Sequence, residues 1–487
     1  MTGNAGRSCA VIATAVLWVA FSSEAALALG APRVAARTGP EGGGTTGKTL
    51  FRRATVALSG GAKQQLGSQA TRTAPVHIDL PTALRLAGAN NIDLALVRTA
   101  ERRAKAVNDA ATLQFFPWLS VGASYAHHTG AGQEFSGNVL NVDKQLYGRA
   151  ATLGVELDLG DALFNKLAAQ QLQRAAIDDV TAARKDTLLA AANAYFDLVD
   201  AVAVTGIARD ALHISQSYET QLERAVAIGL TNRGEALQVS VQTQRDKVLL
   251  REAQAAQRRD SAALATVLRL DPATDLVPAD RIVVPPTLIS LDTPTTALVR
   301  RALRLRREIK ASAASVRAAQ EQRSAAKYGP LIPSLSATAV YGRLRGGPNG
   351  FLGGYQPSHD YVVGLRWRLG PGGLFDFSRT EAADAKLDRA RLNAVDVRQR
   401  IERQVVDALA DARSARDQVR LSRRGAELAA QNLKFAMERK AFGVYAVLEV
   451  VQAQQDLTRA RRDYAGALTR YAKAQYALAR AVGVIHR

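Results

Sequence analysis

Cysteine is almost absent from this sequence of 487 residues. The one cysteine, Cys9, lies in an N-terminal segment that we expect to be removed, so the remaining chain would have neither disulfides nor thiol chemistry. Histidine is also scarce, with six residues, and no H-E-x-x-H, G-x-S-x-G or Walker pattern occurs. These absences argue against an enzyme, and they predict neither a metal site nor a cofactor.

Long apolar runs are missing beyond the first 28 residues, where no stretch has the uninterrupted length of a transmembrane helix. Any later membrane crossing would therefore need strands. The first 28 residues themselves read as a secretory signal peptide, with Arg7, an apolar run and a cleavage site after Ala28. A short core helix or a membrane anchor is the alternative. We expect an exported protein.

Acidic residues are outnumbered, at 44 against 64 Lys and Arg, which gives a net charge of +20. Such a charge suits nucleic acid or anionic lipid as a partner. Export and the lack of a base-reading motif argue against nucleic acid and leave outer-membrane lipid. Residues 29–74 are rich in Gly, Ala and Thr, and we expect a flexible basic extension there.

Proline is missing from residues 161–271 and from residues 372–487. Proline exclusion over such distances predicts continuous helices, broken only at turns near residues 228–234 and 442–444. A helix over residues 164–227 would be about 96 Å long at 1.5 Å per residue. An earlier helix is expected over residues 79–113, starting at Asp79 with Pro81 behind it.

The two halves resemble each other at a nearly constant offset. Three residues recur 216 positions later and two recur 214 positions later. The pairs are Pro117 and Pro333, Leu119 and Leu335, Tyr125 and Tyr341, Gly229 and Gly443, and Glu235 and Glu449. This offset predicts a tandem duplication, with a first repeat over 75–270, a linker over 271–293 and a second repeat over 294–487.

Each half also contains alternating apolar and polar residues, clearest over 153–159 and 361–369. The period of two predicts strands with one apolar and one polar face, of a length that suits a tilted bilayer crossing. The charges of the polar face are Glu156, Asp158, Arg366 and Arg368. With the similar segments around Leu119 and Leu335, the chain offers four such strands. Four strands cannot close a barrel alone, and an open edge in lipid is costly, so several chains would share one barrel. A wide polar lumen lined by these charges favours twelve strands over eight. A periplasmic sheet packed on one side is the alternative.

In the last expected helix, which follows the turn near residues 442–444, apolar residues recur at a spacing of seven. Polar residues at Gln454, Arg461 and Gln475 interrupt the complementary register, which indicates a wall of laterally packed helices that is wet on one side, or else an ordinary coiled coil. Between the strands, His127-His128 and residues 345–350 are expected to lie in exposed loops, with neither metal-site nor phosphate-loop context.

Taken in order, these features resemble the TolC-like outer-membrane efflux proteins. The resemblance rests on the proline before each first strand, the strand ends at Leu159-Gly160 and Leu369-Gly370, the two turns and the repeat. It implies a mainly α-helical homotrimer in which a long α-helical barrel continues into a twelve-stranded β-barrel, four strands per chain. The protein would lie in the outer membrane of a Gram-negative cell and extend into the periplasm.

The resemblance also implies sites. The turns would dock a periplasmic adaptor that links the channel to an inner-membrane transporter, in an efflux or type I secretion system. The matching positions are Ile228, Gly229, Leu230, Phe442, Gly443 and Val444, with Glu235 and Glu449 where the family usually has Asp. A periplasmic constriction could include Asp407, Asp411 and Asp417, for which ordinary solvated positions are the alternative. The competing function is an exported coiled-coil adaptor or scaffold without a barrel.

Overall fold

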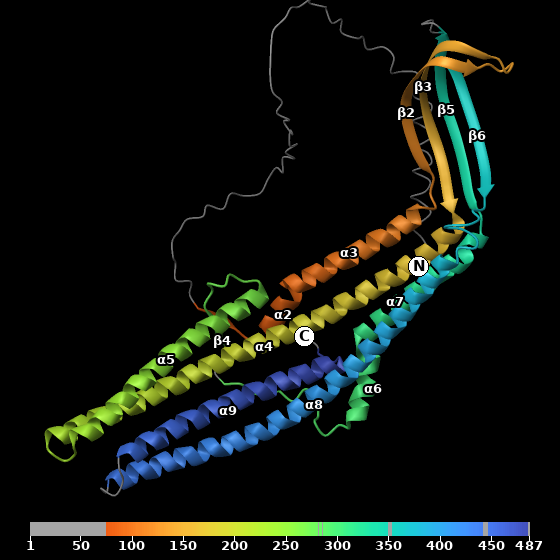
Figure 1. The fold of residues 1–487 in the computed structure, drawn as a ribbon. Coiled ribbons are helices and arrows are strands. Elements are labelled where there is room, and N and C mark those ends of the chain that lie inside the picture. Colours follow the sequence, from red (N-terminus) through yellow and green to blue (C-terminus); the bar gives the residue numbers. More distant parts are fainter. Residues whose placement is uncertain (1–74, 281, 285, 349–352, 442–446, 486–487) are drawn as a thin grey trace, which may run out of the picture. The chain divides into compact units, whose positions relative to one another are not determined.

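The computed structural model describes residues 75–487 except 281, 285, 349–352, 442–446 and 486–487 (Figure 1). The expected signal peptide (1–28), the basic extension (29–74) and Phe442, Gly443 and Val444 lie outside the described residues. The elements in chain order are β1 (Val76–Ile78), α2 (Leu80–Asn90), α3 (Ile92–Leu113), β2 (Trp118–Gln133), β3 (Val139–Asp158), α4 (Leu159–Ala227), α5 (Arg233–Leu268), β4 (Leu276–Pro278), α6 (Thr295–Leu305), α7 (Arg307–Tyr328), the 3-10 turn η1 (Gly329–Leu331), β5 (Ser334–Pro348), β6 (Gln356–Arg366), α8 (Phe377–Ala441) and α9 (Val447–Val482).

Two long helices dominate the fold, as the distribution of proline predicts. α4 has 69 residues and α8 has 65, so each is about 100 Å long at 1.5 Å per residue. α4 begins at Leu159, five residues before the expected start, directly after the last residue of β3. The early start is favoured by Asp161, an acidic residue in the first helical turn. A Cβ on Gly160 would lie 2.3 Å from the carbonyl oxygen of Gly329, so this glycine lets α4 and η1 meet closely.

The helix expected over residues 79–113 is broken into α2 and α3, and this expectation was wrong. Asn91 stands between them in an extended conformation, and its side-chain oxygen accepts hydrogen bonds from the N–H groups of Asp93 (2.8 Å) and Leu94 (3.4 Å). The asparagine therefore caps a new helix in place of continuing the old one. The predicted start is confirmed, because Asp79 caps α2 by accepting from the N–H of Thr82 at 3.1 Å.

The two halves use the same sequence of elements. α2 and α6 each have 11 residues, α3 and α7 each have 22, and α5 and α9 each have 36. α4 packs along α3, α5, α7 and α9, while α8 packs along α7 and α9 (Figure 1). The segment expected to be only a linker contributes β4, which pairs in parallel with β1 at the register Val76 to Leu276. This agreement in length is what a duplication would produce; the duplication and its boundaries stay predictions.

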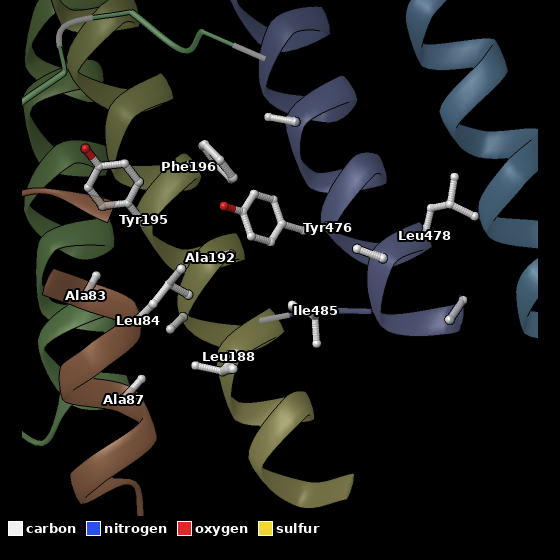
Figure 2. Close-up of a cluster of buried hydrophobic side chains, with 14 of the residues drawn as sticks. Ala83, Leu84, Ala87, Leu188, Ala192, Tyr195, Phe196, Tyr476, Leu478 and Ile485 are labelled. Carbon is white, nitrogen blue, oxygen red and sulfur yellow. The ribbon is translucent and has the colours of Figure 1, made fainter. Parts of the chain in front are cut away.

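The largest hydrophobic core forms where α2, α4, α5, α6, α8 and α9 come together, and Figure 2 shows part of it. Tyr476 of α9 points toward α4, where its ring centroid lies 5.6 Å from that of Phe196. The neighbouring Tyr195 is fully buried and donates its hydroxyl to Asp280 at 2.9 Å. α4 also contains the one window, among the described helices, that is apolar enough to cross a membrane; half of that window is buried. A helix whose apolar side chains form the core passes the same test.

Two of the polar residues that interrupt the heptad in α9 are buried, contrary to the expected wet face. Gln454 is 2% exposed and Gln475 is 0% exposed. Gln454 donates to the carbonyl oxygen of Ala211 at 3.0 Å, and the Gln475 side-chain oxygen accepts from the N–H groups of Leu288 (3.1 Å) and Ile289 (3.2 Å). Because each amide is hydrogen-bonded, its burial is tolerated. Arg461 remains partly exposed and lies 3.9 Å from Asp210.

An ionic network built on two buried arginines ties the end of α9 to the α6–α7 junction and to α4. Arg480 donates to Glu308 at 2.6 Å and to Asp186 at 2.5 Å. Arg306 donates to the same Oε1 of Glu308 at 2.9 Å and to its Oε2 at 3.0 Å, and it reaches the carbonyl oxygen of Ala481 at 3.2 Å. Burial opposes ionisation of Glu308, but the hydrogen bonds from the two arginines lower the pKa of its carboxyl from 4.5 to about 2.

The remaining strands form one antiparallel sheet in the order β2-β3-β5-β6. They have 16, 20, 15 and 11 residues, longer than the alternating segments predicted. His127 and His128 therefore lie within β2, and Arg345 lies within β5, so the expected loops were wrong. Backbone pairing continues past the alternating residues because the ladder does not depend on apolar side chains. At the other end, β6 stops at Arg366, and ten residues (367–376) separate it from α8.

The network around Glu308 predicts an acid-dependent stability. A carboxyl whose pKa falls from 4.5 to about 2 on folding stabilises the folded state above pH 4.5, and this contribution is lost as the pH falls toward 2. We expect Glu308→Gln to lower the free energy of unfolding by about 2–3 kcal/mol at pH 7. Near pH 2 the variant and the wild type should have almost the same free energy of unfolding. Thermal unfolding in detergent, followed by circular dichroism at both pH values, measures the difference.

The control is Glu427→Gln, which removes an exposed carboxylate paired with Arg423 at 3.2 Å within α8. Exposed pairs contribute about 0.5 kcal/mol or less. An equal loss of stability in the two variants at pH 7 would contradict the assigned role of Glu308.

Candidate functional site

The four-stranded sheet has two chemically different faces. Residues paired across antiparallel strands point to the same side, so the register sorts them. One face begins with rows of paired apolar residues, which are Leu157, Leu335 and Leu365, then Val155, Ala337 and Val363, then Leu119, Leu153, Ala339 and Tyr361. The opposite face begins with Asp158, Ser334 and Arg366, followed by Glu156, Ser336 and Gly364. The predicted alternation therefore produces one apolar and one polar face.

Three of the four charges predicted for the lumen share the polar face. Glu156 and Asp158 are exposed on β3, and Arg366 is exposed at the end of β6. Arg368 lies beyond β6 in the loop toward α8, so its predicted place in the strand was wrong. Within the described part of the chain no ion pair joins these four residues. That they line a lumen as paired rings stays a prediction.

The aromatic residues of the sheet lie both at the ends of its strands and inside them. Trp118 does begin β2, but it lies on the polar face, where its ring covers Gly154 so closely that a Cβ would be 2.3 Å away. Tyr125, Tyr341 and Tyr361 lie well inside their strands, on the apolar face. Tyr125 packs against Tyr147 with ring centroids 4.7 Å apart.

The sheet is open in the single chain. Among the described residues β2 pairs only with β3, and β6 pairs only with β5, so each has one free edge. A free edge offers a row of unpaired N–H and C=O groups to another strand. Both edges are therefore available for pairing with further strands.

The turn between α4 and α5 has the backbone geometry that the sequence suggests. Gly229 adopts a φ of +76°, and the N–H of Leu230 donates to the carbonyl oxygen of Ala225 at 2.9 Å, as in a Schellman ending. Ile228 and Leu230 on either side are 71% and 77% exposed. Arg233 and Gly234, expected in the turn, already belong to α5.

Glu235 has a structural role that the sequence comparison did not assign. Its backbone N–H donates to the side-chain oxygen of Asn232 at 2.9 Å, and its carboxylate accepts from the hydroxyl of Thr231 at 2.6 Å. These bonds cap the start of α5 in the manner of a capping box. In the second half, Glu449 is an exposed acidic residue in the first turn of α9.

The residues proposed for a constriction lie far from this end of the helices. Asp407, Asp411 and Asp417 are exposed on α8. Asp417, the last of them, is 24 residues before the end of α8, or about 36 Å along the axis. Asp407 and Asp411 lie at the level of Val405 and Leu409, which belong to the central core. Asp417 lies 3.7 Å from Arg420 as an exposed pair.

Sequence reasoning missed a cluster of arginine and tyrosine on the apolar face of the sheet. Arg149, Arg343 and Arg345 lie there beyond the apolar rows. The sequence contained a sign of this cluster. All three arginines have odd numbers, and the odd-numbered residues of β3 and β5 share this face. Among the described residues no group of three or more histidine, cysteine, aspartate or glutamate side chains could hold a metal ion.

Comparison with known proteins agrees with the fold. Residues 298–484, which run from α6 through α9, match the outer membrane efflux protein family. This match covers the second half of the chain and agrees there with the resemblance seen in the sequence. No curated protein sequence matches the chain significantly.

Solved structures share the fold of this chain along most of their length. A membrane protein from Pseudomonas aeruginosa superimposes with a TM-score of 0.71 at 21% identity, over 83% of this chain and 93% of that one. The outer membrane protein VceC of Vibrio cholerae gives 0.69 at 19% identity, over 83% and 96%. The CmeC outer membrane channel of Campylobacter jejuni gives 0.71 at 20% identity, over 83% and 85%.

The cap at the start of α5 generates a prediction. Asn232→Ala removes the acceptor for the N–H of Glu235, a loss that costs about 1 kcal/mol for a typical helix cap. We expect faster amide hydrogen exchange over residues 233–237, with little change in the melting temperature. Asn393→Ala, an exposed position inside α8, serves as the control. Unchanged exchange at the start of α5 would show that the cap does not hold this turn.

Proposed function

We propose that three copies of the chain form one twelve-stranded β-barrel that continues into an α-helical duct. The channel conducts substrates passively from the periplasm to the exterior, after docking with a periplasmic adaptor and an inner-membrane transporter, in a tripartite efflux or type I secretion system. The observation that carries the proposal is the open four-stranded sheet, with one apolar face and a free edge on either side.

The free edges support an assembly of several chains. In hydrocarbon an unpaired backbone group costs several kcal/mol, because no water can replace the missing partner. Pairing β2 of one protomer with β6 of the next satisfies both edges at once and closes a ring. Three protomers would supply twelve strands, enough for a water-filled lumen. Two protomers would supply eight strands, and side chains fill the interior of an eight-stranded barrel.

The chemistry of the two faces supports their orientation. The apolar rows would face lipid, and Glu156, Asp158 and Arg366 would face the lumen, as in barrels that alternate apolar-out and polar-in. A barrel-free adaptor or scaffold, the competing function, has no use for this sheet.

The long helices also leave apolar surface for neighbours. Several large apolar side chains are exposed along α8 in the single chain, namely Leu392, Val395, Leu421, Leu428 and Phe435. Such a series on one helix is typical of a surface that another helix covers. Lateral packing against the next protomer would bury it and close the helical duct.

The turn between α4 and α5 supports the docking step. Ile228 and Leu230 are exposed beside a glycine whose missing side chain permits close backbone approach. An adaptor hairpin seated there would cover both apolar side chains. The equivalent turn of the second half, at Phe442, Gly443 and Val444, is proposed as a second docking position from the sequence alone.

The first experiment measures the mass of the full-length protein extracted from the outer membrane in mild detergent. We expect a three-chain mass by light scattering corrected for bound detergent, because two free edges per chain must be paired. A monomer, or release without detergent, would rule out the shared barrel.

Docking is tested by Ile228→Glu. A charge on an apolar contact should weaken adaptor binding about tenfold or more and reduce efflux, while the trimer and its single-channel conductance remain. The matched control is Ile282→Glu, the same change at an isoleucine that is 62% exposed in the segment before α6. Equal efflux in both variants would show that this turn does not dock the adaptor.

A further inference from the structure

Three arginines interrupt an otherwise uncharged surface on the apolar face of the sheet. Arg149 of β3 is paired in register with Arg343 of β5, and Arg345 follows on the same side, paired with Tyr147. Between Leu157 and Gln145, the residues that β3 and its neighbours place on this face include no Asp or Glu. Three cations therefore lie close together without a compensating charge.

None of the three arginines is neutralised within the described chain. Arg149, Arg343 and Arg345 form no ion pair there, although most exposed arginines of α8 do. The nearest acidic residue on this face, Asp143, is two rows beyond Tyr147 and is already paired with His127 at 2.6 Å. The Nε atom of Arg345 is buried without a hydrogen-bond partner among the described residues.

Tyrosine rings hold two of these arginines in place. The guanidinium of Arg345 lies 5.0 Å from the ring centroid of Tyr147 and 5.0 Å from that of Tyr355. The guanidinium of Arg149 lies 4.5 Å from the centroid of Tyr355. Stacking of this kind orients the planar donors and reduces the entropy lost when they bind an anion.

The height of the cluster matches the edge of an apolar membrane band. Arg149 is eight residues beyond Leu157; at about 3.4 Å per residue and a tilt of about 40°, it lies about 20 Å above the first apolar row. Tyr147 and Arg345 are one row higher. An outer-membrane barrel has an apolar band about 25 Å tall, edged by aromatic residues. The helices leave the sheet at the Leu157 end, so the arginines mark the opposite, outer edge.

We propose that Arg149, Arg343 and Arg345 form a site for the phosphate groups of an acidic lipid in the outer leaflet. The apolar rows below them would contact the acyl chains, the tyrosines would lie at the level of the headgroup, and the guanidinium groups would donate paired hydrogen bonds to phosphate oxygens. This site rests on the proposed function, because it requires the apolar face to lie against lipid.

The test uses the full-length protein in an uncharged detergent and counts retained lipid by native mass spectrometry. The probe is the diphosphorylated glucosamine lipid that anchors lipopolysaccharide, compared with the same lipid after removal of its phosphates. Wild type should retain the phosphorylated probe and bind the dephosphorylated one at least about tenfold more weakly. Equal retention of the two probes would overturn the site, and so would displacement of the lipid by added inorganic phosphate.

The variant combines Arg149→Gln, Arg343→Gln and Arg345→Gln. We expect retention of the phosphorylated probe to fall about a hundredfold, since each arginine near a membrane surface contributes about fivefold. A control with the same loss of charge replaces three exposed α5 arginines that form no ion pair in the described chain, Arg251, Arg258 and Arg259. Undiminished retention in the sheet variant, or an equal loss in the control, would overturn the proposal.

Arg343→Gln alone keeps the test available if the triple variant does not assemble. This side chain is exposed, and its replacement should weaken retention about fivefold; unchanged retention counts against the site. Failure of the lipid site can be told from failure of the channel. A trimer that ignores the phosphates overturns only the site, whereas a monomer released without detergent overturns the channel and the site with it.

Discussion

In the proposed channel, the arrangement of this protein depends on the pairing of backbone groups at the two edges of its sheet. Within hydrocarbon every N–H and C=O must find a partner in protein, and the single chain leaves β2 and β6 each half paired. Other features are consistent with that need. The apolar rows lie on one face, exposed apolar side chains run along α8, and the helices begin where the strands end.

Sequence patterns predicted those properties that follow from local periodicity or from the exclusion of one residue type. Absence of proline located α4 and α8 to within a few residues at most boundaries, because proline removes a helical hydrogen bond. Alternation sorted Glu156 and Asp158 onto a different face from Leu157. The lengths of the strands were missed, since a ladder continues through Gly, His and Thr once its neighbour is in register.

Properties that depend on distant partners could not be read from the sequence. Gln454 and Gln475 interrupt a heptad and suggested a wet surface, but each is buried against a partner about 190 or more positions away in the chain. The break at Asn91 depends on side-chain capping that competes with an otherwise helical pattern. Glu235 shows the converse case, because a residue noted for its family position also has a local role in capping α5. The arginines of the apolar face were not predicted as a cluster, because the sequence alone does not show which residues of β3 and β5 are paired.

The two halves join strand to long helix in different ways. In the first half β3 becomes α4 with no residue between them, and Gly160 seats that junction against Gly329. In the second half ten residues intervene, closed by a hydrogen bond from the N–H of Leu374 to the carbonyl oxygen of Arg368. The tilt of β3 therefore fixes the direction of the α4 axis, while the direction of α8 is not tied to the tilt of β6. In the proposed barrel, a change in strand tilt would redirect one long helix of each protomer and leave the other unchanged.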